Sequence, residues 1–379
     1  MRAAVSRLAF IDALKAIASQ LIVLHHLAFY GPMSDFAQGL APALMTWLSQ
    51  DARIAVQVFL VIGGFLAAKG LAPDGKLLAG DFLALVRKRY LKLAIPYLAA
   101  LLLSVVCAFI ARQWMNHDSI PSAPTSQQFV AHALLLQNIL GFNAISAGVW
   151  YIAIDFQLFV LLLGILWLAR SLGKKGQRVR VLGVYLVMAL FLASLFYFNR
   201  DAAWDDWAMY FFASYALGAL TYWASNRRQA SNWLGLMVIV VVTALLIDFR
   251  SRIAVALLVA MALGISRQWG VLESWPRVKP LAFLGKISYS VFLVNFPVGL
   301  VINALFARFG SEGPLVNAFG VLMAWAATIV VGALFYHFVE SRTRQTQEWA
   351  AEWTRALAIS PALRILEWGL FVFRAKFRS

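Results

Sequence analysis

The first apolar segment of the chain carries four ionisable side chains within IDALKAIASQLIVLHH, which runs from Ile11 to His26. An ionisable group inside hydrocarbon costs about 2.5–3.5 kcal/mol on insertion scales, so such groups usually mark functional positions. Eleven residues separate Lys15 from His26, which is about three helical turns plus 20°, so both side chains share one face. Asp12 precedes Lys15 by three residues, which is close enough for an ion pair. The spacing predicts one polar line along a helix.

This line suits a long donor molecule with an anionic head. The rise from Lys15 to His26 is about 16 Å, roughly half the hydrocarbon thickness of a bilayer. Phosphates would stay at the lysine while the reactive end reaches His26, and a histidine can act as a base near neutral pH. His25 is rotated by about 100° and falls off the line, which leaves helix packing or acceptor contact open for it. The alternative is that these groups only hydrogen-bond to neighbouring helices.

The elements that must hold this line are membrane helices. The chain of 379 residues is 62% hydrophobic and only 13% charged, with a mean hydropathy of +0.76, whereas soluble domains carry about 25% charged residues. The stretch 127–141 is apolar but too short to span a bilayer, so we expect it to be interfacial or re-entrant. The pattern predicts an all-α polytopic membrane protein with about ten transmembrane helices. The ten apolar segments are about 8–30, 52–71, 91–111, 150–169, 181–198, 207–225, 233–248, 252–267, 283–306 and 316–340.

The distribution of charge predicts the orientation of these helices. The net charge is +16, and with a cytoplasmic N-terminus 26 of the 33 Lys and Arg residues fall on the cytoplasmic side. That asymmetry follows the positive-inside rule, so we expect both termini in the cytoplasm and a lipid bilayer, not a nucleic acid, as the partner of the basic residues. We expect a transmembrane domain over 1–341 and a basic amphipathic cytoplasmic tail over 342–379. The single cysteine, Cys107, excludes an intrachain disulfide.

The first helix resembles the signature of the acyltransferase-3 family, the membrane O-acyltransferases of bacteria and their eukaryotic relatives. That signature is an Arg, ten residues and a His within a stretch like LDGLRGIAALLVVLYH, and here Lys15 stands at the Arg and His26 at the His. The resemblance extends from about residue 8 to 341. Lysine keeps the positive charge but lacks the planar fork with which arginine binds phosphate.

A basic motif before the third predicted helix continues the resemblance. KRYLKLAIPY resembles the family's RRILRLLPPY and places Lys88, Arg89 and Lys92 at its basic positions. The resemblance implies that these three residues, with Lys15, hold the phosphates of coenzyme A at the cytoplasmic face. Ordinary positive-inside charge is the alternative.

The motif WYIAIDFQLF resembles the family's WFLSVEEQFYL, with Trp150 and Tyr151 matched and Asp155 in place of a Glu. Asp155 would lie about a turn and a half below the outer surface, at the depth expected for His26. There it could orient the imidazole and stabilise its charged form. Binding of the acceptor sugar, or an ion pair with an outer-loop arginine, are the alternatives. We expect Trp150 and Tyr151, with His25, on the acceptor side.

The late motif LGKISYSVFLVNFPV resembles LGRISYSLYLWHWPV, with Asn295 where a His is frequent. Because asparagine cannot act as a base, His26 becomes the expected base, and Asn295 is expected to contact the substrate. Ser288 and Tyr289 are expected to hydrogen-bond either the donor or neighbouring helices.

Two further motifs complete the family order. VFLVIGGFLAAKG resembles FFVLSGFL, and its Gly63 and Gly64 are expected to allow close helix packing. FYHFVE resembles YRFIE, and its Glu340 is expected to pair with basic groups at the inner end of the last helix.

The resemblance implies transfer of an acyl group, most simply acetyl from acetyl-CoA, to a hydroxyl of an extracytoplasmic glycan at the bacterial inner membrane. His26 would be the base with Asp155 in support, and no metal is expected. The alternative is a transporter or flippase for a glycan or lipid-linked intermediate, since intramembrane His, Asp and Lys also form proton relays. No repeat that would favour a transporter is visible in the sequence.

Overall fold

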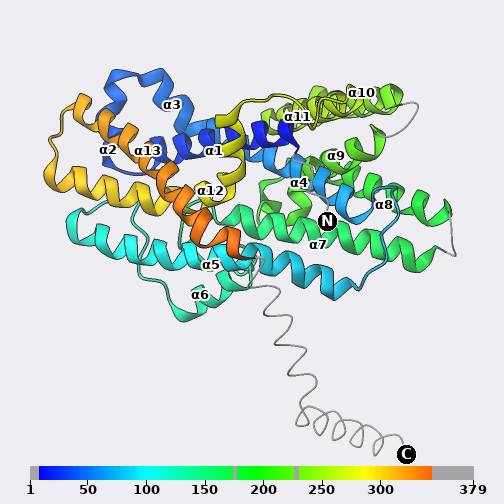
Figure 1. Ribbon diagram of the computed structural model, residues 1–379, viewed down its shortest axis with the longest axis horizontal. Helices are drawn as coiled ribbons and strands as arrows, with labels where there is room; N and C mark the ends of the chain where they lie inside the picture. The colour runs from blue at the N-terminus through cyan, green and yellow to red at the C-terminus, as the bar shows by residue number, and fades with distance from the viewer. Residues whose placement is uncertain (1–7, 174–176, 226–229, 344–379) are drawn as a thin grey trace, which may run out of the picture.

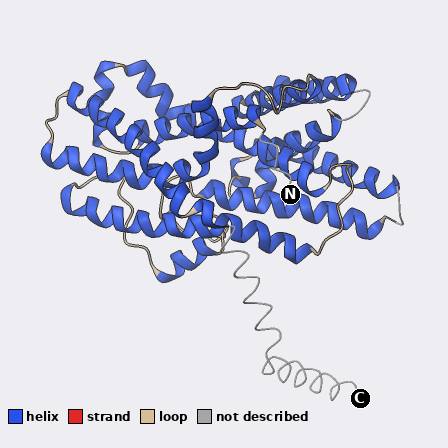
Figure 2. Ribbon diagram, viewed as in Figure 1, coloured by secondary structure: helices blue, strands red, loops and turns tan. Residues whose placement is uncertain are grey.

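The computed structural model describes residues 8–173, 177–225 and 230–343, and these fold into helices joined by loops, without a strand among them (Figure 2). Apart from its first two residues, the tail predicted over 342–379 lies outside the described residues. Figure 1 shows the arrangement and the helix labels used below. In chain order the helices are α1 (Ala9–Phe29), α2 (Pro32–Ala37), α3 (Pro42–Gln50), α4 (Val56–Leu71), α5 (Phe82–Trp114), α6 (Ser126–Ala133), α7 (Trp150–Leu172), α8 (Gln177–Phe196), α9 (Ala208–Ala224), α10 (Ala230–Ile247), α11 (Ser251–Gln268), α12 (Lys279–Phe309) and α13 (Pro314–Phe338).

Within the described residues, nine helices are long and apolar enough to cross a bilayer. The remaining predicted segment, 207–225, is α9, which has 17 residues and is buried along nearly its whole length by other helices. A helix enclosed by protein on all sides needs no lipid-facing surface, so the sequence pattern alone does not distinguish it from a span. The all-α polytopic fold is thereby confirmed, with nine long apolar helices among the described residues and a tenth, α9, buried among α4, α7, α8, α10 and α11.

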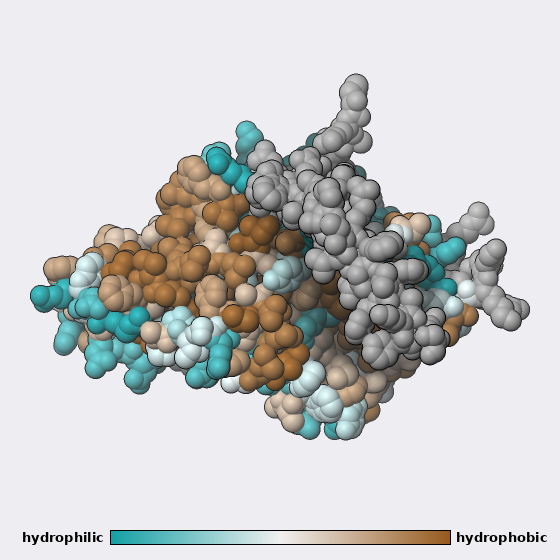
Figure 3. Space-filling view, turned by 90° about the horizontal axis from the view of Figure 1, so that it is seen from below, coloured by the Kyte–Doolittle hydropathy of each residue, from teal (hydrophilic) through white to brown (hydrophobic). Residues whose placement is uncertain are grey.

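The helices form two groups along the long axis of the molecule. In Figure 1, α1, α12 and α13 lie at one end with the short α2 and α3, and α4 with α7 to α11 lies at the other. The long helix α5 contacts both groups, because it packs against α12 and also against α7. Figure 3 shows apolar residues gathered over part of one face, with hydrophilic residues along its edge, as expected for a protein that lies in lipid.

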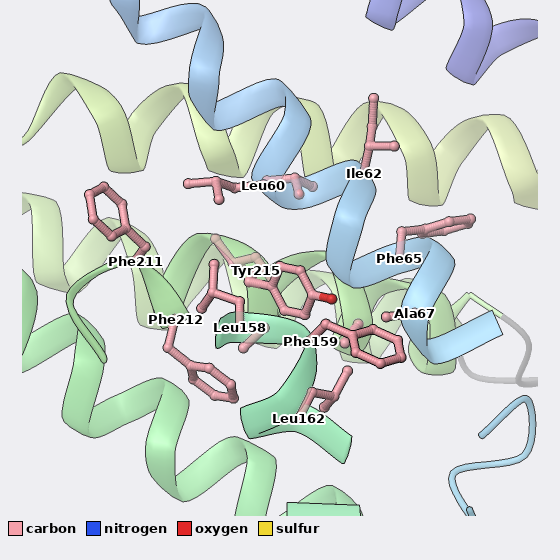
Figure 4. Close-up of a cluster of buried hydrophobic side chains, with 14 of the residues drawn as sticks. Leu60, Ile62, Phe65, Ala67, Leu158, Phe159, Leu162, Phe211, Phe212 and Tyr215 are labelled. Carbon is pink, nitrogen blue, oxygen red and sulfur yellow. The ribbon is translucent and has the colours of Figure 1, made fainter. Parts of the chain in front are cut away.

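Two glycines allow the backbones of α4 and α9 to touch. A Cβ on Gly64 would lie 1.8 Å from the carbonyl oxygen of Tyr215, and one on Gly218 would lie 1.9 Å from that of Val61. No larger residue fits at either point, so the prediction of a packing role for Gly64 agrees with this geometry. Around the crossing, side chains of α4, α7 and α9 such as Phe65 and Leu158 form a closely packed core (Figure 4).

The segment between α5 and α7 returns into the body of the protein. The hydroxyl of Tyr90, near the start of α5, donates a 2.7 Å hydrogen bond to the carbonyl of Ala133 at the end of α6. Tyr90 lies about 36 Å along the helix from Trp114, where α5 ends. The chain therefore runs back beside α5 before α7 begins, which favours the re-entrant alternative for the stretch 127–141. The helix within it covers only Ser126–Ala133.

Candidate active site

His26 lies beside the middle of α12 and is held there by Asn295. Its Nδ1 is 2.5 Å from Oδ1 of Asn295, and Nδ2 of the same asparagine donates a 2.5 Å hydrogen bond to the carbonyl of Phe292. Because the amide nitrogen faces Phe292, the oxygen must face His26, so the imidazole carries its proton on Nδ1. Within the described residues Nε2 has no hydrogen-bond partner. The histidine therefore presents an unprotonated nitrogen.

The depth of this pair follows from the length of α12. Asn295 is 16 residues from Lys279 and 14 from Phe309, so it lies about 24 Å and 21 Å from the two helix ends. His26 is near the C-terminal end of its own helix, but the neighbouring long helix extends well beyond it. The imidazole consequently lies near mid-depth in the protein.

The start of α7 forms one wall beside His26. Gly148 has a φ of +77°, and a Cβ there would approach Cε1 of His26 to 3.1 Å. The ring of Tyr151 contacts that of Phe292 at 5.6 Å between centroids, and Trp150 lies 5.5 Å from Phe211 on α9. Tyr151, predicted on the acceptor side, thus contacts the same phenylalanine that lies against Gly148, whereas Trp150, predicted with it, packs against α9.

His25 faces a different part of the fold. Its Nδ1 is 2.9 Å from the carbonyl of Leu48 in α3, and its side chain is buried. Since that ring is fastened to α3, the geometry agrees with the packing role that the sequence left open for His25.

Asp155 does not reach His26, which corrects the predicted pairing. Its carboxylate forms an ion pair with Arg89 of α5 and is 5% exposed as a residue. Arg89, which the sequence predicts at the phosphates of coenzyme A, is instead engaged by Asp155, and its guanidinium carbon lies 5.2 Å from the centre of the Phe159 ring. An outer-loop arginine was the expected partner in one alternative, but the partner comes from the basic motif of α5.

Several tyrosines surround this ion pair. Tyr151, Tyr215 and Tyr289 each lie within electrostatic reach of Asp155 and Arg89. The hydroxyl of Tyr215 is buried without a partner among the described residues, whereas that of Tyr289 donates to the carbonyl of Leu93 at 3.0 Å. Tyr215, which the sequence analysis missed, belongs to no motif and is visible only once α9 packs against α4.

A second charged group lies nearer the start of α1. Lys15 and Asp12 form the predicted ion pair at 3.4 Å. Lys92 interacts electrostatically with Arg89, Glu340, Lys15 and Asp155, so these residues lie near one another although they come from different helices.

The other residues of this region are placed as follows. Glu340 accepts a 2.5 Å hydrogen bond from Ser290, a contact that the sequence does not indicate. The hydroxyl of Ser288 donates a 3.0 Å hydrogen bond to the carbonyl of Gly285 in its own helix. The side chain of Lys88 is exposed to solvent. The intrahelical bond favours the structural alternative for Ser288, while Lys88 remains available to a soluble ligand.

Comparison with known proteins assigns the chain to a family. A family model described as an acyltransferase domain, that of the acyltransferase-3 family, matches residues 8–337. No curated protein and no solved structure gave a match. The family match contains His26, Asn295, the Arg89–Asp155 pair and Lys15, whereas Glu340 lies just beyond the matched region. The chain therefore belongs to the acyltransferase-3 family and is a multi-pass membrane acyltransferase.

Proposed function

We propose that this protein transfers an acyl group, most simply acetyl, from acyl-coenzyme A on the cytoplasmic side to a hydroxyl of a glycan on the outer side. The observation that carries the proposal is the bond between Asn295 and Nδ1 of His26, because it leaves Nε2 as the base. Family membership supplies acyl transfer, and the excess of basic residues on one side supplies the orientation. A bacterial inner membrane is the location that this donor and acceptor require.

In this mechanism Nε2 of His26 takes the proton from the acceptor hydroxyl as its oxygen attacks the thioester carbon. The tetrahedral intermediate then collapses, the carbon–sulfur bond breaks, and the imidazolium returns the proton to the departing thiolate. Asn295 keeps the ring in the productive tautomer and stabilises its charged form through Oδ1.

The charged group around Lys15 is the proposed site for the phosphates of coenzyme A. Lys15, Lys92 and the exposed Lys88 supply positive charge, and the helical rise from Lys15 to His26 is about 16 Å. Arg89 is engaged by Asp155, so its role is to fix α5 against α7 beneath the thioester arm, with Tyr289 at its side. Trp150 and Tyr151 would contact the acceptor.

The test is acetyl transfer by purified protein carrying His26→Ala, with His25→Ala as the matched control on the same helix. Removal of the base should lower kcat by about 10²–10⁴-fold, while the control should lose stability with a much smaller change in kcat. Binding of acetyl-coenzyme A to both variants separates donor affinity from chemistry. If folded His26→Ala transfers acetyl at a near-wild-type rate, the proposal is wrong.

A further inference from the structure

Acyl transfer at His26 needs positive charge that no cationic side chain supplies. Attack on a thioester moves an electron pair onto the carbonyl oxygen, and preorganised donors for that oxyanion are usually the largest contribution to catalysis. Among the described residues, those that bond or interact electrostatically with His26 are Asn295 and His25. Lys15 is about 16 Å away along α1. The donors must therefore come from the backbone or from neutral side chains.

The first turn of α7 supplies such donors next to the histidine. Gly148, the residue against the imidazole, is followed directly by Val149 and Trp150. The N–H groups of Tyr151 and Ile152 bond back to the carbonyls of Gly148 and Val149. In the described structure, no acceptor is bonded to the N–H groups of Val149 and Trp150. The start of a 23-residue helix also carries a positive partial charge.

A buried and incompletely bonded side chain lies at the same point. Gln137 is 2% exposed, and its Nε2 donates a 3.4 Å hydrogen bond to the carbonyl of Val149. Its Oε1 is sealed from solvent without a partner among the described residues. A buried polar atom without a partner is uncommon in native proteins and needs an explanation. A substrate hydroxyl bound beside Val149 would provide the missing partner.

We propose that the first turn of α7 binds the oxyanion of the acyl-transfer intermediate through the N–H groups of Val149 and Trp150, and that Gln137 positions Val149. The inference rests on the proposed function. As the acceptor oxygen bonds to the thioester carbon, its proton passes to Nε2 of His26 and the carbonyl electron pair moves to oxygen. The two N–H groups stabilise that charge until the carbon–sulfur bond breaks and the thiolate recovers the proton.

A matched pair of variants removes one donor and little else. The φ of Val149 is −62°, which fits a proline ring, and the preceding glycine has no Cβ to clash with it. Both Val149→Pro and Val149→Ala lose the valine side chain. Only Val149→Pro also loses the backbone N–H. Relative to Val149→Ala, we expect Val149→Pro to lower kcat by about 10²–10³-fold with an unchanged Kd for acetyl-coenzyme A. Equal kcat values in the two variants would overturn the inference.

A second pair keeps the inference testable if the proline variant does not fold. Gln137→Glu places a carboxylate beside the proposed oxyanion, and Gln137→Met is a neutral control of similar length. We expect kcat of Gln137→Glu to fall, relative to Gln137→Met, as rising pH ionises the new carboxyl group. Parallel pH profiles would contradict the inference. If the wild-type protein transferred no acetyl group, the proposed function itself would fail, so the two failures are distinguishable.

Discussion

Arg89 and Asp155 hold opposite charges in the interior of the protein, where each depends on the other. The side chain of Asp155, on α7, is 6% exposed, and that of Arg89, on α5, is 23% exposed. Burying one charge without its partner is strongly unfavourable, whereas replacing both by apolar groups is often tolerated. The pair is therefore a connection between two helices as well as a feature of the site.

This dependence predicts an asymmetric response to substitution. Asp155→Leu should lower the free energy of unfolding by about 3 kcal/mol, near the low end of the range for buried pairs, because it leaves Arg89 uncompensated. The double variant Arg89→Leu with Asp155→Leu should recover part of that loss. Thermal unfolding in detergent, analysed as a double-mutant cycle, measures the coupling. Additive losses would show that the two side chains do not interact.

At the scale of elements, the crossing of α4 and α9 fixes the core from which α7 is supported. Backbone contact at Gly64 and Gly218 leaves no room for side chains, so the two helices act as one rigid unit. Asp155 lies beside this unit, since a Cβ on Gly63 would be 3.3 Å from its Oδ1.

We expect Gly64→Ala to destabilise the protein by about 1–3 kcal/mol or more, because the new Cβ would overlap a backbone carbonyl that cannot move freely. Gly70→Ala, in the same helix with nothing within 4 Å of its Cβ, is the control and should be neutral or slightly stabilising. Thermal unfolding of both variants decides the matter. Equal melting temperatures would contradict the close crossing.

Two hydrogen bonds of the His132 ring stabilise the re-entrant segment. Nδ1 of this buried ring is 2.8 Å from the carbonyl of Gln128, and Nε2 accepts a 3.2 Å hydrogen bond from the N–H of Ile145. The second contact requires the neutral ring, because a protonated Nε2 cannot accept a hydrogen bond. Burial lowers the pKa of His132 below its ordinary value of 6.5. The folded state thus binds a proton less readily than the unfolded one.

It follows that stabilisation by His132 is present above pH 6.5 and is lost as the pH falls toward the lowered pKa. We expect amide exchange at Ile145, corrected for intrinsic rates, to become roughly tenfold faster between pH 7.5 and 5, as for loss of one hydrogen bond. In His132→Gln the exchange should be fast at both pH values. A wild-type rate independent of pH would contradict this role.

Under the proposed function, the whole molecule holds the reaction centre between two aqueous sides. The long helices α5 and α12, of 33 and 31 residues, are more than long enough to cross a bilayer, and His26 lies beside the middle of α12. The positive-inside rule predicts that the side with the excess of basic residues faces the cytoplasm.

Accessibility of single cysteines tests this orientation. In a Cys107→Ala background, we expect Asp74→Cys, between α4 and α5, to react with an impermeant maleimide only after the membrane is permeabilised. Glu312→Cys, between α12 and α13, should react with the same reagent while the membrane is intact. The reverse pattern would invert the topology, and labelling of both positions from outside would contradict the helix arrangement.

The sequence was sufficient to predict the helices and part of the site. Hydrophobic length predicted each long helix, and helical spacing predicted the pair Asp12–Lys15, because both features are local. It did not predict the hydrogen bond between Asn295 and His26, or the ion pair between Asp155 and Arg89. Those contacts join residues 269 and 66 positions apart, and depend on how far each helix is shifted along its neighbours.

The start of α7 inside the protein has a consequence for the membrane as a barrier. With α6 folded back beside α5 and the base at mid-depth, the proposed donor and acceptor each need to enter only half of the protein. Neither coenzyme A nor the glycan would ever have to cross, and the acyl group alone would change sides. Under the proposed function, cleavage of the thioester bond would drive both the acyl transfer and the passage of the acyl group across the membrane. The cell would keep coenzyme A in the cytoplasm while it modifies glycans on its outer surface.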